Sequence, residues 1–126
     1  MNAKNIIAVG AILAGLTVVI GAFGAHALRP LLEANDRVSA FETGVLYQMF
    51  HSLAILITGI IAHHYPSKNI SRAFWCFLIG VLLFSGSLYG LATVGWMWLG
   101  PVTPVGGLFF IVGWVLLTLG VLKGLT

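Results

Sequence analysis

The stretch FETGVLYQMFH, Phe41–His51, decides how this chain folds, because a few polar side chains there enter an apolar helical segment. Glu42 stands near its start. Gln48 and His51 follow three residues apart, and Tyr47 precedes His51 by four, so all three converge on one side of a helix. An unpaired amide or imidazole costs several kcal/mol in hydrocarbon. We therefore expect this side of the helix to face protein.

The composition identifies the solvent of most of the chain as lipid. Hydrophobic residues make up 60% and charged residues 7% of the 126 residues, and the mean hydropathy is +1.06. A soluble domain of this length has too little interior to bury that apolar fraction. The six basic residues are scattered singly, which argues against a nucleic-acid partner. The single cysteine forms no internal disulfide.

Four apolar segments are each long enough to cross about 30 Å of hydrocarbon as a helix. They comprise residues 6–28, 43–62, 73–95 and 104–122, and the Gly- and Pro-containing segment 95–104 separates the last two. Residues 31–41, which follow Pro30, alternate apolar and charged positions at helical spacing. The sequence predicts one all-α domain, residues 1–126, with four transmembrane helices and a short amphipathic interfacial helix between the first and second.

The beginning of the chain resembles a secretory signal, since Lys4 precedes an apolar run that ends near Ala25-His26-Ala27. Such signals have an apolar core of about 7–15 residues. The run here, residues 6–23, is longer, so we expect it to remain as the first membrane span.

Basic residues are distributed unequally between the two sides of the membrane. Four spans place both termini on the side of the loop between the second and third helices. That side carries Lys4, Lys68, Arg72 and Lys123, whereas Arg29 and Arg37 lie on the other. The positive-inside rule then predicts that both termini are cytoplasmic.

Small residues recur at helical spacing and predict close helix–helix contacts, which are important in lipid because no hydrophobic effect drives helices together there. The first span carries one narrow stripe of small residues, Gly10, Ala14, Thr17, Gly21 and Gly24. A second shallow groove lies round the same helix and comprises Ala11, Gly15, Ala22 and His26, so we expect that helix to pack on two sides. The predicted packing glycines are Gly10, Gly21, Gly24, Gly86, Gly90, Gly106, Gly113 and Gly120.

The polar residues of the second span allow two interpretations. They either hold a polar ligand or relay a proton through His51, or they hydrogen-bond across helices and fix the packing. Candidate partners on the third span are Ser85, Tyr89 and Thr93. At the outer interface, we expect His26 either to contact Glu42 or to be solvated among headgroups.

No metal, cofactor or catalytic motif is predicted. His63 and His64 are adjacent, so their side chains point about 100° apart on a helix, and no further ligand completes a site. No base lies near Cys76 in the sequence, and no phosphate loop or nucleophile elbow occurs. The sequence therefore favours a protein that is not an enzyme.

Four separated motifs carry a family resemblance: GAFGAHAL (Gly21–Leu28), TGVLYQMFHSLA (Thr43–Ala54), LFSGSLYGLA (Leu83–Ala92) and GPVTPVGGLFFIVGW (Gly100–Trp114). Together they resemble the domain-of-unknown-function 423 family, small bacterial membrane proteins similar to eukaryotic transmembrane protein 256. The resemblance implies four transmembrane helices, an integral membrane location and no established activity. We expect the membrane to be the bacterial cytoplasmic membrane. Its motifs contain the polar residues His26, Tyr47, Gln48, His51, Ser85, Ser87, Tyr89 and Thr103, which favours one polar cluster near the outer half of the bundle.

Two functions follow as the main hypotheses, and an intramembrane enzyme or a lipid-binding protein is the remaining option. The first is a non-enzymatic role in envelope integrity or in assembly of a complex, with the lipid bilayer and a second copy or another membrane protein as partners. The alternative is a small homodimeric channel or transporter whose polar path passes His51.

Overall fold

A computed structural model describes residues 1–124, and the regular secondary structure in that range is entirely helical. Four of its helical stretches are long and apolar enough to cross a membrane, which confirms the predicted all-α membrane fold. The elements are α1 (Ala3–Ala25), α2 (Arg29–Ala34), α3 (Val38–His64), α4 (Lys68–Gly80), the π-helical turn η1 (Val81–Ser85), α5 (Gly86–Thr93), the 3-10 turn η2 (Met97–Leu99) and α6 (Val102–Gly124).

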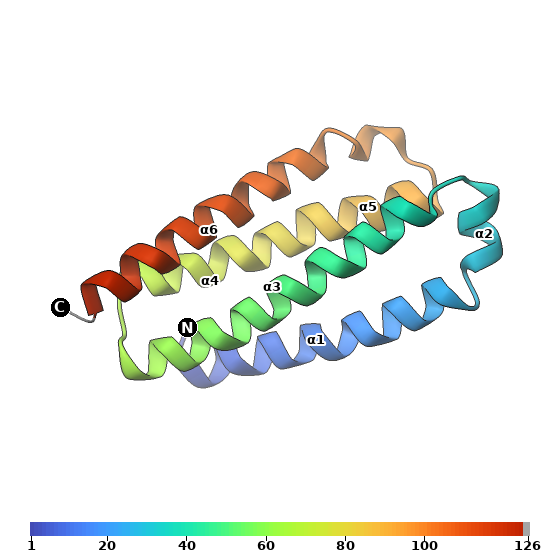
Figure 1. Ribbon diagram of the computed structural model, residues 1–126. Helices are drawn as coiled ribbons and strands as arrows, with labels where there is room; N and C mark the ends of the chain where they lie inside the picture. Colours follow the sequence, from blue (N-terminus) through green and yellow to red (C-terminus); the bar gives the residue numbers. More distant parts are fainter. Residues whose placement is uncertain (125–126) are drawn as a thin grey trace.

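Helix α3 lies in the middle of the bundle (Figure 1). Helix α1 packs almost entirely against α3, whereas α6 packs mainly against α4 and η1. The third span is a continuous rod of α4, η1 and α5 that contacts both α3 and α6. The start of α1 and the end of α6 lie at the same end of the bundle as the α3–α4 connection, and α2 lies at the opposite end (Figure 1).

The apolar core has two parts. The larger lies between α3, α4 and α6, with Ile6 of α1 at its side, and includes the fully buried Ile55, Phe74 and Phe77. The smaller lies beneath α2, where Leu32 and Phe41 pack together with Ala92. Close packing of this kind supplies much of the helix association energy in lipid.

The short helix after the first span is present but ends earlier than the sequence predicted. Helix α2 stops at Ala34, and Asp36 adopts a left-handed backbone conformation with φ of 53°. Aspartate tolerates this conformation better than most residues, and it ends the helix. Phe41 therefore belongs to α3, and the Asn35 side chain anchors the turn by donating to the Ala92 carbonyl at 3.0 Å.

Most of the predicted packing glycines lie against a neighbouring helix. A Cβ atom added to Gly10 would meet the backbone nitrogen of Leu56 at 2.6 Å, so only glycine permits this α1–α3 approach. The others that face a neighbouring residue are Gly21 (Val45), Gly24 (Phe41), Gly90 (Leu99), Gly106 (Phe84), Gly113 (Phe77) and Gly120 (Ile70).

Two packing predictions are wrong. Gly86 faces open space, because the wide turn of η1 changes the phase of the helix and directs Ser85 and Ser87 inward instead. The second groove of α1, Ala11, Gly15, Ala22 and His26, is exposed, because α1 lies at the edge of the bundle and packs on one side. Three close-approach glycines were not predicted, Gly44, Gly59 and Gly80.

The α1–α3 contact gives the first testable prediction. Gly10→Ala should lower the free energy of unfolding by about 1–3 kcal/mol, because its methyl group overlaps the α3 backbone. Gly15→Ala is the matched control on the same helix, since nothing lies within 4 Å of its Cβ position. Reversible unfolding in detergent micelles measures both variants. Equal stability of the two would contradict the observed packing.

Candidate functional site

Gln48 joins three of the four spans through its side chain. Its Oε1 atom accepts a hydrogen bond from the Tyr89 hydroxyl at 2.6 Å, and its Nε2 atom donates to the Leu13 carbonyl at 3.4 Å. The side chain is buried, so neither bond competes with water. One amide on α3 therefore holds α1 on one side and α5 on the other.

His51 has both ring nitrogens engaged. Its Nδ1 atom lies 2.8 Å from the Tyr47 carbonyl, and the indole nitrogen of Trp114 donates to Nε2 at 3.1 Å. Since a carbonyl only accepts and an indole N–H only donates, Nδ1 carries the proton and the ring is neutral. The Phe110 ring stacks on the imidazole with centroids 3.5 Å apart. His51 thus links α3 to α6.

Serine and threonine hydroxyls add further links between the spans. Ser85 donates to the Gly44 carbonyl at 2.7 Å, and Ser87 lies 2.5 Å from the Thr103 hydroxyl. These bonds join the third span to α3 and to the start of α6. The Thr93 hydroxyl, in contrast, donates to the Tyr89 carbonyl of its own helix.

We call Gln48, His51, Ser85, Ser87, Tyr89 and Thr103 the polar cluster. Within residues 1–124, no buried side-chain nitrogen or oxygen lacks a hydrogen-bond partner. Beyond the cluster, toward the end that carries the termini, Ile55, Phe74 and Phe77 fill the interior. The polar cluster is therefore closed upon itself.

Tyr47 lies at the edge of this cluster, although the sequence predicted that it would point inward. The residue is 39% exposed, its ring packs on Phe84, and its hydroxyl has no hydrogen-bond partner among the described residues. It lines a groove of about 400 Å³ between α3 and α6, which we call the α3–α6 groove. The groove is formed by Tyr47, His51, Phe84, Pro104, Gly107, Leu108, Phe110, Ile111 and Trp114.

His26 and Glu42 do not meet each other or the polar cluster. His26 is exposed at the end of α1, whereas the exposed Glu42 carboxylate lies 3.4 Å from the Nη1 atom of Arg29. Arg29 also bonds Glu33 at 2.8 Å. That bond and the neighbouring carboxylates raise the pKa of the Arg29 guanidinium. The i, i+4 spacing of Arg29 and Glu33 was the sequence signal for this ion pair.

Trp114 is the cluster contact that sequence reasoning missed, because a tryptophan within an apolar span is usually an anchor or packing residue. His63 and His64 are exposed at the end of α3. In the part of the chain that the structure describes, no group of three His, Cys, Asp or Glu residues is placed to hold a metal ion.

Comparison with known proteins agrees with this architecture. Residues 20–107 match the family described as Protein of unknown function (DUF423). A UPF0382 membrane protein of Staphylococcus epidermidis is 42% identical over 120 residues, 95% of this chain and 97% of that protein. The UPF0382 membrane protein YwdK of Bacillus subtilis is 37% identical over 121 residues, with 95% and 98% covered. A UPF0382 membrane protein of Haemophilus influenzae is 43% identical over 107 residues, 84% of each chain. No solved structure matches.

The Gln48–Tyr89 bond gives a second prediction. Gln48→Leu should lower the free energy of unfolding by about 1–2 kcal/mol, because it removes two interhelical bonds, and one of them is the bond that the Tyr89 hydroxyl donates to the amide. After Tyr89→Phe, the same substitution should cost less, since the shared bond is already absent. Unfolding of both single variants and the double variant in detergent measures the difference. If the free-energy losses of the two single variants add up to that of the double variant, the Gln48–Tyr89 bond contributes nothing to stability.

Proposed function

This chain belongs to the DUF423 family of membrane proteins, and we propose that its role is non-enzymatic and structural, exerted by assembly with another membrane-spanning helix. The closed polar cluster is the observation that carries this proposal. A transport path needs polar groups that are free to contact a solute, and a catalytic base needs a free lone pair.

The state of His51 argues against transport and catalysis. Its lone pair on Nε2 accepts from Trp114 and its proton on Nδ1 is donated to Tyr47. A proton relay through His51 would have to break both bonds. The apolar residues beyond it, Phe74 and Phe77 among them, offer no next acceptor.

The α3–α6 groove supports assembly. Its walls are apolar and aromatic, and the Tyr47 hydroxyl presents a polar group toward lipid without a partner in residues 1–124. Tyrosine and tryptophan at such a surface are typical of interface centres. Gly107 on the groove wall permits close approach of a helix backbone. A spanning helix with a hydrogen-bonding side chain at this depth would satisfy Tyr47.

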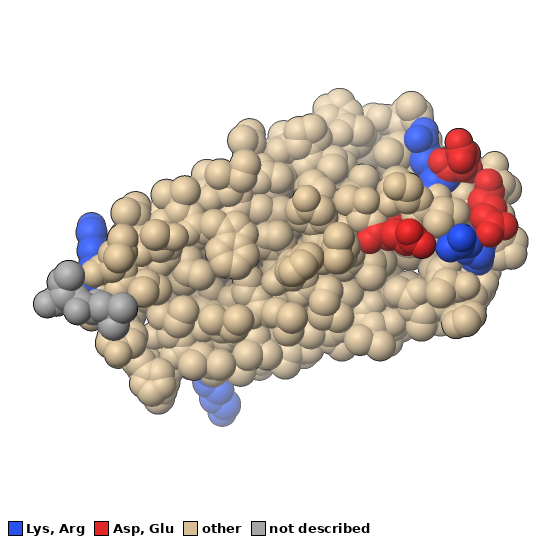
Figure 2. All heavy atoms as spheres, in the orientation of Figure 1, with Lys and Arg blue, Asp and Glu red and all other residues tan. Residues whose placement is uncertain are grey.

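We further propose that both termini are cytoplasmic and that the membrane is the bacterial cytoplasmic membrane. Figure 2 shows acidic and basic atoms gathered together at the α2 end. That end carries two basic residues, Arg29 and Arg37, and all three acidic residues of the chain. The opposite end carries Lys4, Lys68, Arg72 and Lys123, and the positive-inside rule assigns it to the cytoplasm.

The orientation predicts a labelling pattern in intact cells. In a Cys76→Ser background, Ala34→Cys should react with a membrane-impermeant maleimide from outside, whereas Lys68→Cys should react only after permeabilisation. Both positions are exposed at opposite ends of the bundle. Labelling of Lys68→Cys in intact cells would reverse the proposed orientation.

A structural role predicts that the protein conducts no ions, and this can be measured in proteoliposomes. Proteoliposomes should show no proton or ion flux above protein-free vesicles, because the polar cluster is closed. Flux in the unmodified protein that His51→Ala abolishes would instead establish the channel alternative.

In native membranes, a photo-crosslinking amino acid at Ile111, in the groove, should give a discrete protein adduct of one mass. The matched control carries the photo-crosslinking amino acid at position 82 instead. Ile111 and Leu82 are 61% and 62% exposed, and Leu82 lies outside the groove. Adducts of equal yield at both positions would contradict a specific partner surface.

A further inference from the structure

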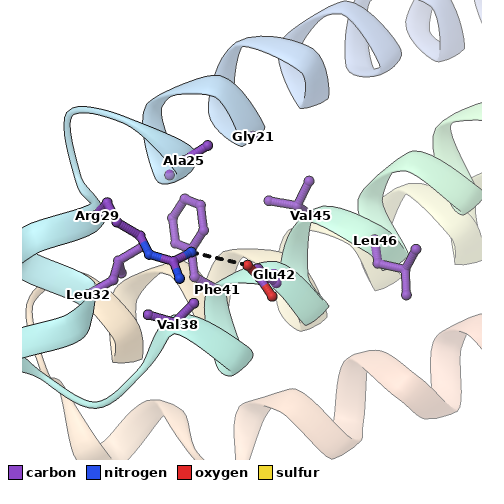
Figure 3. Close-up of a pocket in the computed structure, with 10 residues that line it drawn as sticks. Gly21, Ala25, Arg29, Leu32, Val38, Phe41, Glu42, Val45 and Leu46 are labelled. Atoms are coloured by element: carbon purple, nitrogen blue, oxygen red, sulfur yellow. Dashed lines mark hydrogen bonds and ion pairs between the residues drawn. The ribbon is translucent and has the colours of Figure 1, made fainter.

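A second hollow lies at the α2 end of the bundle, where α1, α2 and α3 meet, and we call it the interfacial pocket. It has a volume of about 250 Å³. Figure 3 shows Ala25, Leu32, Phe41 and Val45 around it, with Arg29 and Glu42 joined across it.

The position of the interfacial pocket matches the boundary between hydrocarbon and headgroups. Helix α1 ends at Ala25, and α2 lies beyond that end of the bundle with Arg29 exposed to solvent on its first turn. Gly21 and Leu46 continue the pocket wall into the apolar part of the bundle. An amphiphile in this pocket would therefore have its polar part at Arg29 and its apolar part toward Leu46.

The two charged groups of the pocket keep unused hydrogen-bonding capacity. A guanidinium has five N–H donors, and the bonds of Arg29 to Glu33 and Glu42 use two of them. The bond to Glu42 is long, at 3.4 Å, and it reaches only Oε1. The pocket thus offers a cation and an anion side by side, each with room for a further partner.

We propose that the interfacial pocket binds an aminophospholipid, a lipid whose headgroup carries a phosphate and a protonated primary amine. The phosphate accepts hydrogen bonds from Arg29, and the ammonium group donates to Glu42. The first methylene groups of an acyl chain lie against Val45 and Leu46. This inference does not depend on the proposed structural role.

The charges favour this ligand over other lipids. An anionic headgroup without an amine would bring its charge toward the Glu42 carboxylate and supply no ammonium group to neutralise that carboxylate. A choline headgroup carries a positive charge but no N–H donor for the carboxylate.

Binding can be tested on the purified, delipidated full chain in detergent. Phosphatidylethanolamine, phosphatidylcholine and phosphatidylglycerol are added in turn, and both the unfolding temperature and the retained lipid, by mass spectrometry, are measured. We expect phosphatidylethanolamine to raise the unfolding temperature most and to be retained most strongly. Equal effects of the three lipids on the unmodified protein would overturn the proposal.

Three variants test whether the lipid binds in the interfacial pocket. Glu42→Gln should weaken phosphatidylethanolamine binding roughly tenfold and remove its advantage over phosphatidylcholine, because a charge-assisted bond is lost. Ala25→Leu should abolish retention by filling the pocket. Glu33→Gln is the control: Glu33 bonds Arg29 but does not line the pocket, so lipid selectivity should persist.

All three positions are exposed, and each variant should unfold at the unmodified temperature when no lipid is present. Unchanged lipid selectivity in Glu42→Gln, or unchanged retention in Ala25→Leu, would refute the site.

Discussion

Hydrocarbon offers no hydrogen-bond partner, and the packing of this protein depends on how the polar groups at membrane depth find partners within the chain. Gln48 is central, since its amide reaches both the Leu13 carbonyl on α1 and the Tyr89 hydroxyl on α5. His51 then connects α3 to Trp114 on α6. Each of the other three spans is thereby bonded to α3. Because interhelical bonds are individually weak in membranes, their value lies in specifying register together.

Backbone shape makes these bonds possible. Glycines let the helices approach closely enough for short side chains to reach across, as at Gly10 against Leu56 and Gly106 against Phe84. The π-helical turn η1 has a similar effect, because its wider turn directs Ser85 toward the Gly44 carbonyl and Ser87 toward Thr103. Such turns are frequent at functional sites, and here the turn completes the polar cluster. The exposed groups, Tyr47 and the Arg29–Glu42 pair, lie at the two hollows for which we propose a helix and a lipid as ligands.

The sequence was sufficient for the fold because apolar length and charge position act at the scale of whole helices. It also identified Gln48, His51, Ser85 and Tyr89, since a polar group in an apolar span needs a partner wherever that partner lies. It failed where one residue changes the direction of the chain. The left-handed Asp36 ended α2 early, and η1 rotated Gly86 outward. The sequence also did not predict two hydrogen-bond partners, Trp114 for His51 and the Leu13 carbonyl for Gln48. Neither partner has a local sequence signal that marks it as one.

The hydrogen bonds of this structure require that the polar cluster is dry and that His51 is a neutral link between helices. Solid-state NMR of ¹⁵N-histidine-labelled protein in bilayers, with a water-edited spectrum and with His51→Gln to assign the signal, tests this most directly. We expect a neutral ring protonated at Nδ1, with Nε2 accepting from Trp114 and no magnetisation transfer from water. A doubly protonated ring, or strong transfer from water, would contradict the account and indicate a hydrated path through the bundle.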